Sequence, residues 1–94
     1  MVQLKALPKF ERAFKKFFAK EQDLIRTEIS KIKSNPLLGE PKKGSLAGVR
    51  VHKFKLYHQL YLIAYEYQPK NKTLFLYAIG THENYYDALE RYLH

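Results

Sequence analysis

The sequence contains no cysteine, which removes three kinds of chemistry at once. Without thiols there is no disulfide framework, no thiolate nucleophile and no sulfur ligand for a metal. Long apolar runs are also missing, because the longest, Leu60 to Tyr65, is far short of the roughly 18 residues that cross a bilayer. Near the start, Lys5, Lys9 and Arg12 interrupt the apolar segment that a secretory signal requires. We therefore expect a soluble, cytoplasmic protein that does not enter a membrane.

Acidic residues are scarce, with nine Asp and Glu against 17 Lys and Arg. The deficit is concentrated in residues 31–55, which hold seven bases and one acid, whereas residues 56–94 hold three bases and four acids. A concentrated positive segment attracts a polyanion through phosphate contacts and counterion release. Nucleic acid is therefore the predicted partner, and lysines that serve only solubility are the alternative.

The chain is long enough for one hydrophobic core, so residues 1–94 are expected to form a single domain. Residues 2–6 alternate as in a short strand, and Pro8 suits the first turn of a helix. Apolar residues then recur at spacings of three and four, which predicts a helix that buries them and shows a basic face outward: Phe10, Ala13, Phe14, Phe17 and Phe18. After a break around Lys20, a second apolar stripe predicts a helix that ends before Asn35-Pro36.

The second half of the sequence predicts a loop, three strands and a helix. Residues 35–48 contain three of the four glycines and two of the four prolines, which predicts a long loop. Residues 49–56, 60–67 and 73–81 are rich in Val, Ile, Phe and Tyr and predict an antiparallel meander. Thr81 can cap a final helix. The order βααβββα, with strands grouped after a helical hairpin, indicates an α+β fold.

The strand at residues 49–56 has an irregular pattern. Alternation places Arg50, His52, Phe54 and Leu56 on one face and Val49, Val51, Lys53 and Lys55 on the other. Both faces mix apolar and charged residues, which favours a functional surface. An edge strand that lysines protect from aggregation is the alternative.

The available side chains suit RNA cleavage without a metal. The four histidines fit no metal-ligand motif, and no phosphate loop or cofactor motif is present. Attack by a 2′-hydroxyl needs a base, an acid and cations around the phosphorane, and imidazole can serve as acid or base. His82 and Tyr86 are four residues apart, so they share a face of the predicted last helix. From spacing alone a core position is favoured for Tyr86, whereas for His82 a functional role is favoured over that of a helix cap.

Three segments follow one another within the order βααβββα: KKGSLAGVRVHKF, LYLIAYEYQPKNKTLFLYAIG and GTHENYYDALERYL. In this order they resemble the RelE/ParE superfamily of type II toxin-antitoxin toxins over nearly the whole chain. The resemblance implies an α+β domain in which a helical hairpin packs on a twisted antiparallel sheet with a C-terminal helix. It also implies a cognate antitoxin, and the charge of this chain makes that antitoxin acidic and amphipathic, folding as it binds.

The resemblance to the RelE-like branches implies cleavage of mRNA, generally on the ribosome and without a metal or cofactor. It marks four residues as catalytic candidates: Arg50, His52, His82 and Tyr86. His52 and His82 would be acid and base in unassigned order, Arg50 would stabilise the phosphorane, and Tyr86 would stack or orient. RNA would be bound by a further group: Lys42, Lys43, Lys53, Lys55, His58 and Tyr85.

Two features of the resemblance leave other functions open. Many relatives carry an arginine early in the third strand, where this chain has His58-Gln59. The ParE branch has the same fold but poisons DNA gyrase by binding, and fold alone does not separate the branches. The histidine cluster favours RNA chemistry. A gyrase poison and a non-catalytic RNA-binding relative are the alternatives.

Overall fold

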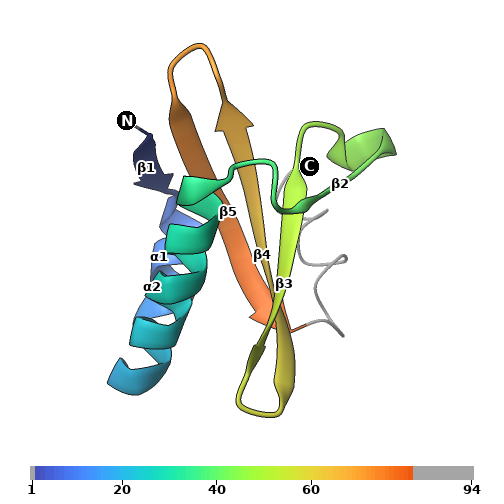
Figure 1. Ribbon diagram of the computed structural model, residues 1–94. Helices are drawn as coiled ribbons and strands as arrows, with labels where there is room; N and C mark the ends of the chain where they lie inside the picture. The colour runs from blue at the N-terminus through green and yellow to red at the C-terminus, as the bar shows by residue number, and fades with distance from the viewer. Residues whose placement is uncertain (1, 82–94) are drawn as a thin grey trace.

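The computed structural model describes residues 2–81 (Figure 1). The elements in chain order are β1 (Gln3–Ala6), α1 (Pro8–Lys15), α2 (Ala19–Ser34), β2 (Glu40–Pro41), the short 3₁₀ turn η1 (Gly44–Leu46), β3 (Arg50–Leu56), β4 (Gln59–Gln68) and β5 (Thr73–Thr81). The predicted C-terminal helix lies outside the described residues. Within that described part of the chain, neither helix has the length and apolar character needed to span a bilayer.

The five strands form one mixed sheet in the order β1-β5-β4-β3-β2. Strands β2 to β5 pair antiparallel, as the sequence predicts, but β1 pairs parallel with β5. The prediction of a purely antiparallel sheet is therefore wrong at this edge. After β1 the chain forms the helical hairpin. Strands β3, β4 and β5 then alternate in direction, so that β5 lies beside β1 and runs parallel to it. Strand β2, within the predicted loop, was not expected from the sequence.

Helix α1 ends at Lys15, earlier than the sequence predicts. Its last turn tightens, because the Phe17 amide donates to the Phe14 carbonyl at 3.1 Å. The Gln22 side chain then donates to the carbonyls of Phe14 and Phe17 at 3.2 and 3.1 Å, which caps the end of α1. Phe18 therefore lies outside α1 and is 79% exposed, so the prediction that the hairpin buries it is wrong.

The sheet is packed on both faces. Its first face carries the main core beneath the helices, formed by Phe10, Ile25, Ile29, Ile32, Phe54, Leu56, Ile63, Tyr65, Leu74 and Leu76. A smaller core on the second face contains Leu46, Val49, Val51, Leu62 and Ala64. Phe54 and Leu56 thus lie on the face opposite Val51, which confirms the predicted alternation of β3. We call the two sides the helix face and the second face.

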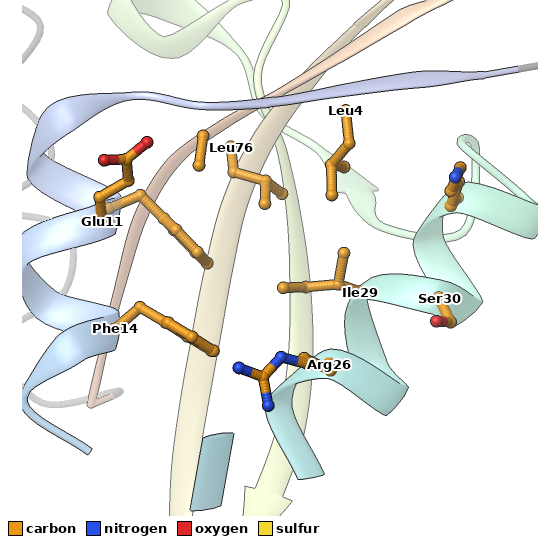
Figure 2. Close-up of a pocket in the computed structure, with 10 residues that line it drawn as sticks. Leu4, Glu11, Phe14, Arg26, Ile29, Ser30 and Leu76 are labelled. Carbon is orange, nitrogen blue, oxygen red and sulfur yellow. The ribbon is translucent and has the colours of Figure 1, made fainter. Parts of the chain in front are cut away.

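A groove of about 390 Å³ opens between α1 and α2 above the β1–β5 edge (Figure 2). Its apolar lining includes Leu4, Phe14, Ile29 and Leu76. The Arg26 guanidinium lies 5.2 Å from the centre of the Phe14 ring, a cation–π contact at the rim of the groove. The helical layer therefore leaves part of its apolar surface uncovered by the described residues.

Candidate nucleic-acid interface

Exposed lysines of β3 lie on the second face of the sheet. The register places Lys53 opposite Leu62 of β4, and Leu62 opposite Gly80 of β5. Leu62 belongs to the second core, and paired residues of an antiparallel sheet share a face, so Lys53 belongs to that face too. Lys55, two residues on, follows it. Both lysines are exposed, and 45% of the Lys53 side chain is accessible.

One carboxylate lies among these cations. Glu40 of β2 has its two oxygens 3.8 Å from the ammonium groups of Lys42 and Lys53. The Lys42 side chain is only 18% exposed, and its amide donates to the Val49 carbonyl at 3.0 Å. Lys42 therefore helps to hold β2 against the start of β3, while Lys53 keeps more of its surface open to a ligand. Surface pairs at this distance are weak, so a phosphate can compete with Glu40.

The other predicted RNA-binding residues in the described part of the chain also reach solvent. Lys43 precedes η1 and is exposed. His58 is exposed in the turn between β3 and β4, next to Tyr57, which has a left-handed φ of 58°. Tyr85, the sixth predicted RNA contact, lies outside the described residues. The second face thus carries Lys53 and Lys55 on the surface, the β3–β4 turn carries His58, and Lys43 is exposed before η1.

His52 points to the helix face and has a partner there. Its Nε2 lies 2.8 Å from Oε1 of Glu28 on α2, and Lys31 donates to Oε2 of the same carboxylate at 3.0 Å. Burial raises the pKa of Glu28, but the hydrogen bonds from His52 and Lys31 outweigh it and leave that pKa below its ordinary value. The His52 side chain is 12% exposed. The histidine therefore ties β3 to α2.

Arg50 is bound to the segment between α2 and β2. Its Nη1 donates to the carbonyls of Leu37 and Gly39 at 3.2 and 2.8 Å. The same segment is fastened by Tyr65, whose hydroxyl donates to the Pro36 carbonyl at 2.8 Å and accepts the Gly39 amide at 2.7 Å. Burial raises the pKa of the Tyr65 phenol. Arg50 and Tyr65 together hold this part of the predicted loop in one conformation.

Two of the four predicted catalytic residues lie in the described part of the chain. Arg50 and His52 lie on the helix face, opposite the surface that carries Lys53 and Lys55. His82 and Tyr86 lie outside the described residues. The last described residue is Thr81, which pairs with Tyr61 of β4. The catalytic roles of all four residues stay predictions.

Three residues that shape this region were missed by reasoning from sequence. Glu40 carried one detectable signal, since it is the single acid of residues 31–55. Glu28 and Tyr65 carried none that pointed to this region, because Glu28 is 24 residues from His52, and Tyr65 is 26 and 29 residues from Gly39 and Pro36. Such contacts depend on how α2 and the following loop cross the sheet. Local periodicity does not record that crossing.

Residues 2–81 form a small α+β domain with exposed lysines on its second face, and comparison with known families gives its class. Residues 4–90 match the family model described as the ParE-like toxin of type II bacterial toxin-antitoxin systems. The chain belongs to this family. No curated protein sequence matches the chain.

Solved structures of bacterial toxins share the fold. A chain of the Escherichia coli RelBE toxin-antitoxin complex superposes with a TM-score of 0.70 at 14% identity, over 86% of this chain and 96% of that one. A chain of the Mycobacterium tuberculosis RelBE2 complex gives 0.72 at 14% identity, over 86% and 98%. The Helicobacter pylori protein HP0892, described as a conserved hypothetical protein, gives 0.58 at 22% identity, over 88% and 97%. The resemblance to the RelE/ParE superfamily and the α+β fold predicted from sequence are confirmed.

Proposed function

We propose that this toxin is a metal-independent endoribonuclease that cleaves mRNA on the ribosome and so inhibits translation. The observation that carries the proposal is the pair of exposed lysines on the second face, Lys53 and Lys55 of β3. An RNA backbone is the ligand that such a pair attracts. The structural likeness to RelE toxins adds support at the level of the fold.

The proposed reaction is attack of a 2′-hydroxyl on the adjacent phosphorus, with loss of the 5′-oxygen. His82 is the stronger candidate for proton transfer, because the Nε2 of His52 is already bound to Glu28. We assign the phosphate contacts to Lys53 and Lys55 ahead of Arg50, whose guanidinium is engaged by two backbone carbonyls. Tyr86 is proposed to stack on a base of the substrate. No metal or cofactor takes part in this scheme.

The test is induction of the wild-type protein and its variants, with primer extension on cellular mRNA. We expect His82→Ala to reduce cutting by about 100-fold or more, the usual contribution of an acid or base. The double variant Lys53→Gln/Lys55→Gln should weaken cutting by lowering RNA affinity. The matched control is Lys70→Gln/Lys72→Gln, which removes the same charge from the exposed β4–β5 turn at the other end of the sheet (Figure 1).

Two results would contradict the proposal. Growth arrest with intact mRNA would exclude cleavage, and equal losses in the two double-lysine variants would exclude a specific role for the second face.

Coexpression of the cognate antitoxin should restore growth. We propose that this antitoxin uses an acidic, amphipathic segment, since the apolar groove of Figure 2 and the positive charge of the chain suit one. Relatives solved as toxin-antitoxin complexes support such a partner.

A DNA gyrase poison that acts by binding is the second candidate function. The observation in its favour is the family model itself, which is described as ParE-like. Loss of supercoiling activity in purified gyrase, together with intact mRNA, would establish this function in place of cleavage. A protein that arrests neither growth nor supercoiling would be a non-catalytic RNA-binding relative.

A further inference from the structure

The turn between α1 and α2 holds an aromatic side chain out in solvent. Phe18 is 79% exposed, more than any other large hydrophobic residue in the described part of the chain. Its neighbour Phe17 packs edge-on against Tyr61 of β4, with ring centres 5.6 Å apart. The ring of Phe18 makes no aromatic contact with residues 2–81. Phe17 therefore packs the turn against the sheet, whereas the Phe18 ring is exposed to solvent.

The exposure of Phe18 is not required by the helix that follows. Phe18 is the N-cap of α2, a position where Ser, Thr, Asp or Asn would satisfy a free amide. Its own amide donates to Oε1 of Glu21 at 2.8 Å, and its carbonyl accepts the Gln22 amide at 2.9 Å. The backbone is thus fixed while the ring contributes nothing to capping. A rigidly presented, exposed aromatic is suited to contact with a partner.

Exposed cations flank Phe18 along the chain. Four bases on α1 and at the start of α2 are exposed: Arg12, Lys15, Lys16 and Lys20. None of them forms an ion pair with another residue of the described chain. On α2, by contrast, Arg26 pairs with Asp23 at 2.8 Å and Lys31 with Glu28 at 3.0 Å. Lys16 and Lys20, two residues before and two after Phe18, are thus exposed without an ion pair in residues 2–81, and the acid at this turn is Glu21, which accepts the Phe18 amide.

The α1–α2 turn lies at the same end of the molecule as the β3–β4 turn (Figure 1). The contact of Phe17 with Tyr61 joins the two regions. Tyr57, 60% exposed, and His58 stand on the β3–β4 turn. Strand β3 leads from that turn to Lys55 and Lys53. An RNA that follows the lysines of the second face toward this end of the sheet comes within reach of the α1–α2 turn.

We propose that the α1–α2 turn is a second RNA-binding surface, in which Phe18 stacks on an unpaired base and Lys16 and Lys20 contact the flanking phosphates. This inference rests on the proposed function and extends it from one face of the sheet to the end of the molecule. Proteins bind single-stranded nucleic acid by stacking bases on exposed aromatic rings while nearby cations contact the backbone, and Phe18 with Lys16 and Lys20 offers both.

The test measures binding of the full-length protein to a short, fluorescent, single-stranded RNA by anisotropy at several salt concentrations. The RNA carries 2′-O-methyl groups, which block the proposed cleavage. We expect Phe18→Ala to weaken binding between about 5-fold and about 150-fold, since a stacked base contributes about 1–3 kcal/mol. The salt dependence should stay unchanged in this variant, because no charge is lost. Phe18→Tyr should bind as the wild type does.

Charge variants give the complementary result. Lys16→Gln/Lys20→Gln should lower the slope of log K against log salt by about 0.7 for each lysine. The matched control for Phe18→Ala is Leu37→Ala, which removes another exposed apolar side chain, 65% exposed in the loop after α2. It should leave both affinity and slope unchanged.

The outcomes separate this inference from the proposed function. If the wild type binds the RNA and Lys53→Gln/Lys55→Gln weakens binding while Phe18→Ala does not, only the second surface is excluded. If Leu37→Ala weakens binding as much as Phe18→Ala, the effect is one of general apolar exposure and the inference fails. If Phe18→Ala impairs binding of the antitoxin and not of RNA, the surface belongs to a protein partner. If the wild type does not bind RNA, both proposals fall.

Discussion

The two faces of β3 use their charged residues in opposite ways. On the helix face, His52 is bound to Glu28 and Arg50 to the carbonyls of Leu37 and Gly39. On the second face, Lys55 is exposed and Lys53 has only a 3.8 Å contact with Glu40. Alternation along one strand thus assigns one set of charges to the fold and leaves the other for a ligand. The comparison predicts that stability and RNA binding depend on different faces.

The largest effect on stability is expected at Gly39, where the helix-face contacts converge. A Cβ at this position would lie 2.7 Å from the Tyr65 hydroxyl and 2.8 Å from its ring. Gly39→Ala should therefore lower the free energy of unfolding by about 1–3 kcal/mol through overpacking, and the hydrogen bonds around Tyr65 would be disturbed as well. Urea denaturation measures the change.

Gly80→Ala is the matched control for this substitution. A Cβ at Gly80 would meet no atom of residues 2–81 within 4 Å, so the expected change is within about 0.5 kcal/mol. Similar losses in the two alanine variants would show that the segment around Gly39 is not specially constrained. The comparison between the two faces would then lose its structural basis.

A smaller and pH-dependent effect is expected at Glu28. Its pKa is lowered in the folded protein, so the ionised carboxylate adds stability above the unfolded pKa, and this contribution is lost as pH falls through the folded pKa. Glu28→Gln should cost about 1 kcal/mol at neutral pH, the usual net value of such a hydrogen bond. The difference between wild type and variant should shrink as the pH falls below the ordinary value of 4.5.

Thermal denaturation across this pH range tests the prediction for Glu28. Asp23→Asn is the control, because Asp23 pairs with Arg26 on the solvent side of α2, where its side chain is 76% exposed. Exposed pairs contribute little, so this variant should remain close to the wild type at every pH. A pH-independent loss in Glu28→Gln would mean that His52 and Lys31 do not stabilise the charged form of Glu28.

Most elements could be predicted from the sequence because they depend on local patterns. The alternation of β3 separates Phe54 from Val51 in the sequence and in the structure alike. The end of α1 could not be predicted, because the apolar spacing continues through Phe17 and Phe18 while Gln22 caps the helix from the following element. Strand β2 depends on pairing with β3, which two residues of sequence do not encode.

Less of the candidate site than of the fold could be predicted from the sequence. Residue type identified Arg50 and His52 as reactive groups, and alternation correctly placed them opposite Lys53 and Lys55. Their partners come from α2 and from the loop after it, so their engagement could be seen only in three dimensions. A basic residue on a strand can thus either stabilise the fold or remain exposed to a ligand, and the face that it occupies determines which role it has.

The smallest effect on stability, and the sharpest test of the comparison, is expected on the second face. Lys53→Gln/Lys55→Gln removes two exposed charges and no buried contact, so the free energy of unfolding should change by less than about 0.5 kcal/mol. RNA binding should nevertheless weaken, and its salt slope should fall by about 0.7 per lysine if each contacts a phosphate. Loss of stability without loss of RNA binding would reverse the roles of the two faces. Glu40 is 3.8 Å from Lys53, so Glu40→Gln removes a negative charge beside the proposed phosphate contact and should raise RNA affinity. A rise in this variant and a fall in Lys53→Gln/Lys55→Gln would show that positive charge on this face favours RNA binding.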